Sequence, residues 1–286
     1  MGILGSLGSA ICSGIKAIGS ALSSGIKTIG KAIKSAMDVA LKVAKQVATS
    51  ALGKAVLTLL KPLAKLATGV LGPVLGPVVA HLIIQAIIET LLKKVTEAEN
   101  EQVDEIGYRV DEAGKHEDWK KPEDFKSFKD YYEYLKEQIP DDQIDRKQLE
   151  EKQYYYKAAG IDTLAKEVGR TEGIETPLDF FIEVARSRMG ENEVQAIIDA
   201  YKKLGLPTVS LHDFLQGKVS PADAGKIREA LLSSLKKYYP EKDMDSLKHR
   251  LFIMEKCSND DLFMVKNSYL KELDDINDNG KASSCL

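Results

Sequence analysis

The chain has 286 residues, of which 44% are hydrophobic and 29% charged, so it can bury a packed core in one large or two modest domains. Its net charge of -3 is unevenly distributed: residues 1–95 hold eleven Lys, no Arg and two acids, a balance of +9, which leaves -12 for the remainder. Three widely spaced cysteines exclude a disulfide framework and lack the paired spacing of a zinc site. The charge asymmetry indicates two parts with different surroundings.

Residues 2–47 carry an apolar stripe with an eleven-residue repeat, close to the period of a straight α-helix. The apolar positions are Ile11, Ile15, Ile18, Leu22, Ile26, Ile29, Ile33 and Met37. The opposite face is basic, with Lys16, Lys27, Lys31, Lys34, Lys42 and Lys45. This pattern predicts an amphipathic helix on an anionic bilayer, with the stripe from Ile11 to Ile33 and the lysines from Lys16 to Lys34 as membrane-binding residues.

The same segment is rich in glycine, and each glycine inside a helix costs roughly 0.5–1 kcal/mol relative to alanine. We therefore expect a poor helix in water that needs a covering surface, either lipid or protein. Small residues also permit close approach between helices. A flexible arm is the alternative, although such an arm has no reason to keep an apolar repeat.

The first six residues match the M-G-x-x-x-[ST] pattern for N-myristoylation, which makes Gly2 a candidate lipidation site. One acyl chain anchors a protein only marginally, so the neighbouring basic helix would supply the second signal.

A second apolar segment, residues 69–92, contains no Lys or Arg and a single acid, Glu89. Pro62 is expected to interrupt the preceding helix. The part after Pro77 is shorter than the roughly 20 residues that span a bilayer, and counting back to Val70 includes two prolines. Lys93 and Lys94 would suit a headgroup boundary.

His81, Gln85 and Glu89 recur every four residues and share one face of this segment. In a membrane, such a polar seam would line a pore or sense pH. In a soluble bundle, it would be the solvated edge of a core helix. Both interpretations stay open from the sequence.

The rest of the chain indicates an acidic linker over residues 96–121, a helical domain over 122–276 and a disordered tail over 277–286. Its amphipathic segments begin with capping patterns at Thr176 and Ser220, and no long alternating pattern occurs, so the sequence predicts an all-α protein. Six tyrosines cluster at 131–134 and 154–156, either as helix core or as a partner-binding face.

No set of residues resembles a catalytic centre. The four histidines make no metal-ligand spacing, and a G-x4-G-K match at Gly25–Lys31 lies inside the apolar repeat without a preceding strand. We expect neither an enzyme nor a cofactor nor a metal. The acidic second half, and the lack of Arg and aromatic residues in the basic first half, disfavour nucleic-acid binding.

These patterns favour a membrane-associated protein that binds and perforates anionic bilayers, either as a secreted toxin or effector or as a virion entry protein. A homo-oligomer or larger assembly is expected, because so apolar a segment must be sheltered before it meets a membrane. The alternative is a structural or adaptor protein whose N-terminal helices pack on a protein partner.

Overall fold

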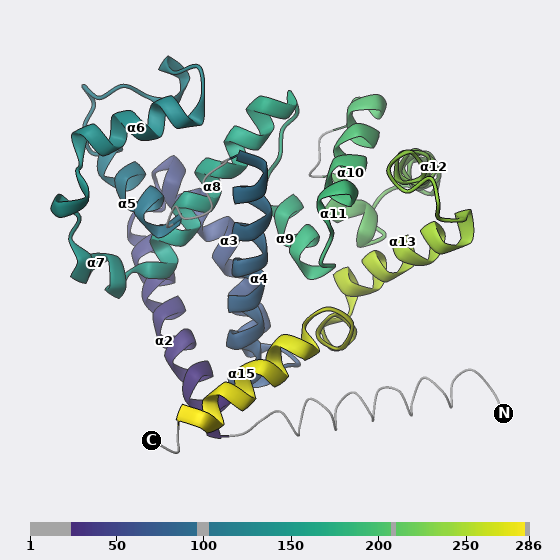
Figure 1. The fold of residues 1–286 in the computed structure, drawn as a ribbon, viewed down its shortest axis with the longest axis horizontal. Helices are drawn as coiled ribbons and strands as arrows, with labels where there is room; N and C mark the ends of the chain where they lie inside the picture. The colour runs from purple at the N-terminus through teal and green to yellow at the C-terminus, as the bar shows by residue number, and fades with distance from the viewer. Residues whose placement is uncertain (1–23, 96–102, 207–209, 284–286) are drawn as a thin grey trace.

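The computed structural model describes residues 24–95, 103–206 and 210–283, and all regular structure in these ranges is helical. The prediction of an all-α protein is confirmed. Figure 1 shows α4 standing in the middle of the molecule, with the remaining helices arranged around it and to either side.

The first three described helices pack against one another: α2 (Ser24–Gln46), α3 (Ala51–Thr68) and α4 (Gly72–Val95). Ser50 begins α3, because its hydroxyl accepts a hydrogen bond of 3.0 Å from the backbone N–H of Gly53. Pro62 lies inside α3, which continues to Thr68, so the expectation that this proline interrupts the helix is wrong. The packing of α3 against its neighbours outweighs the lost backbone hydrogen bond.

The second half consists of shorter helices joined by turns. Their bounds are α5 (Val103–Ala113), η1 (Pro122–Asp124), α6 (Phe128–Gln138), η2 (Asp141–Gln143), α7 (Arg146–Glu151), α8 (Gln153–Glu172), α9 (Leu178–Arg186), α10 (Glu191–Leu204), α11 (Ser210–Leu215), α12 (Pro221–Tyr238), α13 (Met244–Asn259), α14 (Asp261–Met264), η3 (Val265–Tyr269) and α15 (Leu270–Ser283).

Two segments differ from their expected structure. Residues 103–113, within the expected acidic linker, form α5, whose buried residues include Val103 and Ile106. The acids of α5 lie on its outer part, so a segment of low overall hydrophobicity still buries one face. Helix α15 runs to Ser283, and most of the expected disordered tail is therefore helical.

The buried residues of α2, α3 and α4 belong to the same hydrophobic core as those of α5, α8, α9 and α15. Helix α4 contacts α2, α3, α8 and α9. Helix α15 packs on α2, and in Figure 1 it crosses the base of the molecule at the first turns of α2. The apolar N-terminal helices are thus covered by the C-terminal helices rather than standing apart from them.

Glycines allow two pairs of helices to cross closely, α2 with α4 and α5 with α8. A Cβ atom on Gly30 of α2 would lie 2.4 Å from the carbonyl oxygen of Val74 in α4. At the crossing of α5 and α8, a Cβ on Gly107 would lie 1.8 Å from the oxygen of Tyr156, and one on Gly160 would lie 2.1 Å from that of Val103. The expectation that small residues serve close helix packing is confirmed at Gly30, with protein rather than lipid as the partner.

Candidate functional site

Helix α4 is the most apolar element of the described chain and the only described helix that is long and apolar enough to cross a membrane. Within its most apolar window, 61% of the residues are buried inside the molecule. Its first turn contains Pro73, which is tolerated there because backbone N–H groups in the first turn have no hydrogen-bond partner within the helix. Its last turn contains Lys93 and Lys94. A core helix of a soluble protein has the same properties, so length and composition alone do not distinguish the two.

The apolar stripe of α2 faces the protein core. Ile26 is completely buried, Met37 is 2% exposed, and Ile29 and Ile33 are partly buried against the same core. The periodicity therefore identified the buried face, and its covering surface in this structure is the chain itself.

The basic residues of α2 lie on the opposite side. Lys27 and Lys31 are exposed, and Lys34 forms an ion pair of 2.7 Å with Asp38. The other expected membrane-binding residues and the candidate lipidation site lie outside the described residues: Gly2, Ile11, Ile15, Lys16, Ile18 and Leu22.

The polar seam of α4 lies at the edge of the bundle. Gln85 is exposed, and Glu89 is exposed and forms an ion pair of 2.8 Å with Lys93. That hydrogen bond from Lys93 lowers the pKa of Glu89. Both residues therefore lie at an exposed edge of the described bundle.

His81 differs from its two neighbours because it is largely covered by α8. Its Nδ1 lies 2.8 Å from the hydroxyl of Tyr154, and the two rings meet edge to face at 6.0 Å. Burial, followed by the charge of Lys157, lowers the pKa of His81 from 6.5 to about 4. His81 is therefore neutral near pH 7, and its tautomer decides whether Nδ1 accepts the hydrogen bond from the Tyr154 hydroxyl or donates to it.

The sequence placed Tyr154 in a tyrosine cluster but did not single out Lys157. Lys157 lies over the ring of Tyr154, 5.7 Å from its centroid. Five of the six clustered tyrosines are core, at most 4% exposed, and Tyr134 is partly exposed: the five are Tyr131, Tyr132, Tyr154, Tyr155 and Tyr156. The core interpretation of these clusters is confirmed, and one member of them also contacts the α4 edge.

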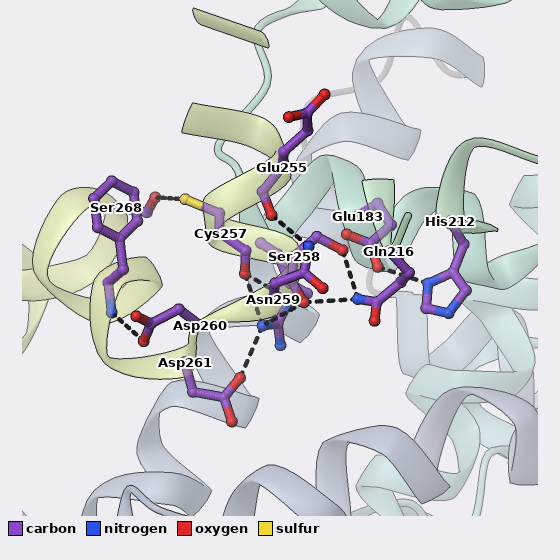
Figure 2. A network of polar contacts seen from close by, with 12 residues as sticks. Glu183, His212, Gln216, Glu255, Cys257, Ser258, Asn259, Asp260, Asp261 and Ser268 are labelled. Atoms are coloured by element: carbon purple, nitrogen blue, oxygen red, sulfur yellow. Dashed lines mark hydrogen bonds and ion pairs between the residues drawn. The ribbon is translucent and has the colours of Figure 1, made fainter. Parts of the chain in front are cut away.

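A second polar network lies away from α4 and connects α9, α11 and α13 (Figure 2). Arg186 donates to the carbonyl oxygens of Cys257 and Ser258 and forms an ion pair of 2.8 Å with Asp261. Gln216 donates to the backbone and side-chain oxygens of Ser258, each at 2.8 Å. These donors satisfy carbonyls at the end of α13 that have no partner within the helix, so this network is structural.

A carboxylate–histidine pair adjoins that network. Glu183 is 1% exposed, and its Oε1 lies 2.8 Å from Nδ1 of His212, as Figure 2 shows. The hydrogen bond to Glu183 raises the pKa of His212. The second carboxylate oxygen of Glu183 and the hydroxyls of Ser187 and Tyr201 are buried without a partner in the structure. Because these residues are far apart in sequence, spacing could not reveal the pair.

Among the described residues, no group of three His, Cys, Asp or Glu side chains could hold a metal ion. A cavity of about 310 Å³ lies between the end of α4 and the α9–α10 turn. Its three cations are each already paired with a carboxylate: Lys93 with Glu89, Lys94 with Glu172, and Arg188 with Glu272. The cavity therefore offers no unpaired positive charge to an anion.

The chain matches no protein-family model, no curated protein and no solved structure.

Proposed function

We propose that this protein binds anionic lipid bilayers and perforates them after α4 leaves the helical core. The observation that supports the proposal is the position of α4, an apolar helix of 24 residues held at the centre of a bundle of amphipathic helices. The bundle gives this helix a soluble form, because its neighbours supply the apolar contacts that lipid would otherwise supply.

Transfer of α4 from the core to a bilayer would cost little in apolar contact or in backbone hydrogen bonds. A helix satisfies its own peptide groups, which is the condition for entering the hydrocarbon region. Lys93 and Lys94 close the helix at one end and would remain at the headgroups. The faces of α2 and α3 that pack on α4 would lose their cover and would meet the membrane in turn.

His81 is the group on α4 suited to trigger this transfer. In the folded protein it shares a hydrogen bond with the Tyr154 hydroxyl and lies near Lys157, and both residues come from α8. Protonation would place a second positive charge near Lys157, in a largely buried position, and would leave Nδ1 able only to donate to the Tyr154 oxygen. The other charges on this edge belong to the Glu89–Lys93 pair and to Arg188 of the α9–α10 turn. The positive charge of Arg188 contributes to the lowered pKa of Glu89.

One apolar helix cannot surround a water-filled pathway, so perforation requires several copies of the chain. We therefore expect a homo-oligomer in the membrane. In that assembly His81, Gln85 and Glu89 would be the residues available to line the pathway, because they share one face of α4.

The test is leakage of an encapsulated dye from vesicles with and without phosphatidylserine, between about pH 7 and pH 5. We expect leakage that requires the anionic lipid and increases toward acid. A fluorophore attached to Ile88→Cys, a partly exposed position of α4, in a background with Cys12→Ser, Cys257→Ala and Cys285→Ser, should move into hydrocarbon under the same conditions. Absence of leakage throughout this range would contradict the proposal.

The position of the α2 stripe favours a second candidate function, that of a structural or adaptor protein. Ile26, Ile29 and Ile33 are already covered by protein, and α2 is helical without lipid. On this alternative α4 is a permanent core helix, the vesicles stay intact, and the fluorophore at position 88 does not enter hydrocarbon.

A further inference from the structure

Two rows of lysines lie on the outer faces of α2 and α3. All but one of them are exposed, and Lys34 is partly exposed. We call them the lysine rows, and they consist of Lys27, Lys31, Lys34, Lys42 and Lys45 on α2, and Lys54, Lys61 and Lys65 on α3. Their spacing of three, four, seven or eight residues keeps each row on one side of its helix. Asp38 is the one acid that α2 and α3 contain.

Most of these lysines have no acidic partner in the part of the chain that the structure describes. Lys34 pairs with Asp38, and no carboxylate of the described residues lies within ion-pair distance of the other seven. Basic side chains elsewhere on the molecule often do have such a partner, as Arg146 has in Glu105 and Arg228 in Glu255. The lysine rows are therefore a concentration of uncompensated positive charge on a protein whose net charge is -3.

The rows are long enough to meet many headgroups at once. Lys27 and Lys45 are eighteen positions apart, which corresponds to roughly 27 Å along α2, and the α3 row covers roughly 16 Å. The buried apolar residues of both helices face the core, and Val39 of α2 is an exception at 40% exposure. The folded bundle can thus present this charge without exposing Ile26 or the buried leucines of α3.

We propose that the folded protein docks reversibly on anionic lipid headgroups through the lysine rows, with its core intact. Lysine is a compact, hydrated charge that suits diffuse contact with a headgroup layer. Residues 24–68 contain neither Arg nor aromatic residues, which are the residues that contact and stack on nucleic acids. The membrane surface is therefore favoured over a nucleic acid as the partner.

This inference rests on the proposed function for its choice of target, but it describes a separate step. Docking needs only the native fold, whereas perforation needs α4 to leave the core. A protein that docks without leakage would support the docking step and contradict the proposed perforation.

The experiment measures binding of the full chain to vesicles of phosphatidylcholine with roughly one-third phosphatidylserine, near pH 7 and in low salt. Two triple variants remove three charges each, K31Q/K42Q/K45Q on α2 and K54Q/K61Q/K65Q on α3. A control removes three exposed lysines from other helices and turns, K126Q/K129Q/K203Q. All three variants change the net charge equally, so they differ only in where the charge is lost.

Each lysine near an anionic surface should contribute up to about fivefold in the partition coefficient. We expect each row variant to bind at least tenfold more weakly than the wild type, and the control to change less than threefold. Binding should weaken when salt rises from about 0.05 to 0.2 M. Far-ultraviolet circular dichroism and thermal unfolding verify that the variants remain folded.

Three outcomes would overturn the inference: equal weakening in all three variants, binding that is unaffected by salt, or binding that equals that to pure phosphatidylcholine. Tighter binding to duplex DNA than to the vesicles, lost in the same row variants, would assign the lysine rows to nucleic acid instead.

Discussion

The hydroxyl of Tyr154 lies 2.8 Å from Nδ1 of His81, and this hydrogen bond joins α8 to the polar edge of the central helix α4. Burial of the ring, followed by the charge of Lys157, lowers the pKa of His81 and keeps the histidine neutral near pH 7. The contact makes the stability of the α4–α8 interface dependent on pH.

Acidification should destabilise the fold through His81. Its pKa is about 4 in the folded protein, against about 6.5 when unfolded, so the unfolded chain binds the proton more tightly. The contribution of neutral His81 to the free energy of unfolding is fully present above about pH 6.5. It is lost as pH falls toward 4, and the loss is about 2 kcal/mol near pH 5. Urea unfolding near pH 7 and pH 5 measures this loss.

The variant His81→Gln should lose less stability between these pH values than the wild type, because its amide does not titrate. His249→Gln is the control, since His249 is exposed and stacks on Phe252. Equal pH dependence in the wild type and His81→Gln would contradict the role of His81.

His212 should act in the opposite direction. The hydrogen bond to Glu183 raises the pKa of His212. Its contribution to the free energy of unfolding is therefore fully present below about pH 6.5 and is lost as pH rises through the pKa of the folded protein. In Glu183→Gln the hydrogen-bonding charge is removed, and the pKa of His212 should fall. Titration of the histidine ring signals by NMR measures this shift, with His249 in the same spectra as the reference. A His212 signal that titrates as in the wild type would contradict the pairing.

The crossing of α2 and α4 should not tolerate a side chain at Gly30. In Gly30→Ala the new Cβ would meet the Val74 carbonyl at 2.4 Å, and this neighbour is backbone, so the helices must separate. We expect a loss of about 1–3 kcal/mol in urea unfolding, despite the better helix propensity of alanine.

Gly225→Ala is the matched control, because Gly225 lies in α12 with nothing within 4 Å of a new Cβ. That substitution should stabilise the protein by up to about 1 kcal/mol. Stabilisation by both substitutions would show that α2 and α4 do not approach as closely as described.

Arg109 should be irreplaceable by lysine. Its guanidinium is completely buried, and it donates to the carbonyl oxygen of Ile139 at 3.0 Å and to the hydroxyl of Tyr132 at 3.3 Å, and it pairs with Asp141. One ammonium cannot reach all three partners. We expect Arg109→Lys to cost about 3 kcal/mol of unfolding free energy.

The exposed Arg146 supplies the comparison. Arg146→Lys should cost clearly less unfolding free energy than Arg109→Lys, because its pair with Glu105 is screened by solvent. Thermal and urea unfolding of both variants test the difference. Similar losses in both would show that burial of the Arg109 guanidinium contributes little.

Several features of this protein could be predicted because they depend on residues close together in the chain. Helical periodicity identified the buried face of α2, including Ile26 and Met37. The Ser220 hydroxyl accepts from the N–H of Asp223 at 3.2 Å and begins α12 as expected. At Thr176 the expected cap is absent, since its hydroxyl donates to the carbonyl of Ala165 at 2.7 Å instead.

The sequence by itself determined the all-α class, the apolar face of α2 and the exceptional apolarity of α4, because periodicity and composition are local properties. Only the tertiary structure decided what covers those surfaces. It packed α15 on α2, enclosed α4 among α2, α3, α8 and α9, and paired His81 with Tyr154 and Glu183 with His212. Those contacts join residues far apart in the chain, and a periodic pattern states that a face is apolar without stating whether protein or lipid covers it.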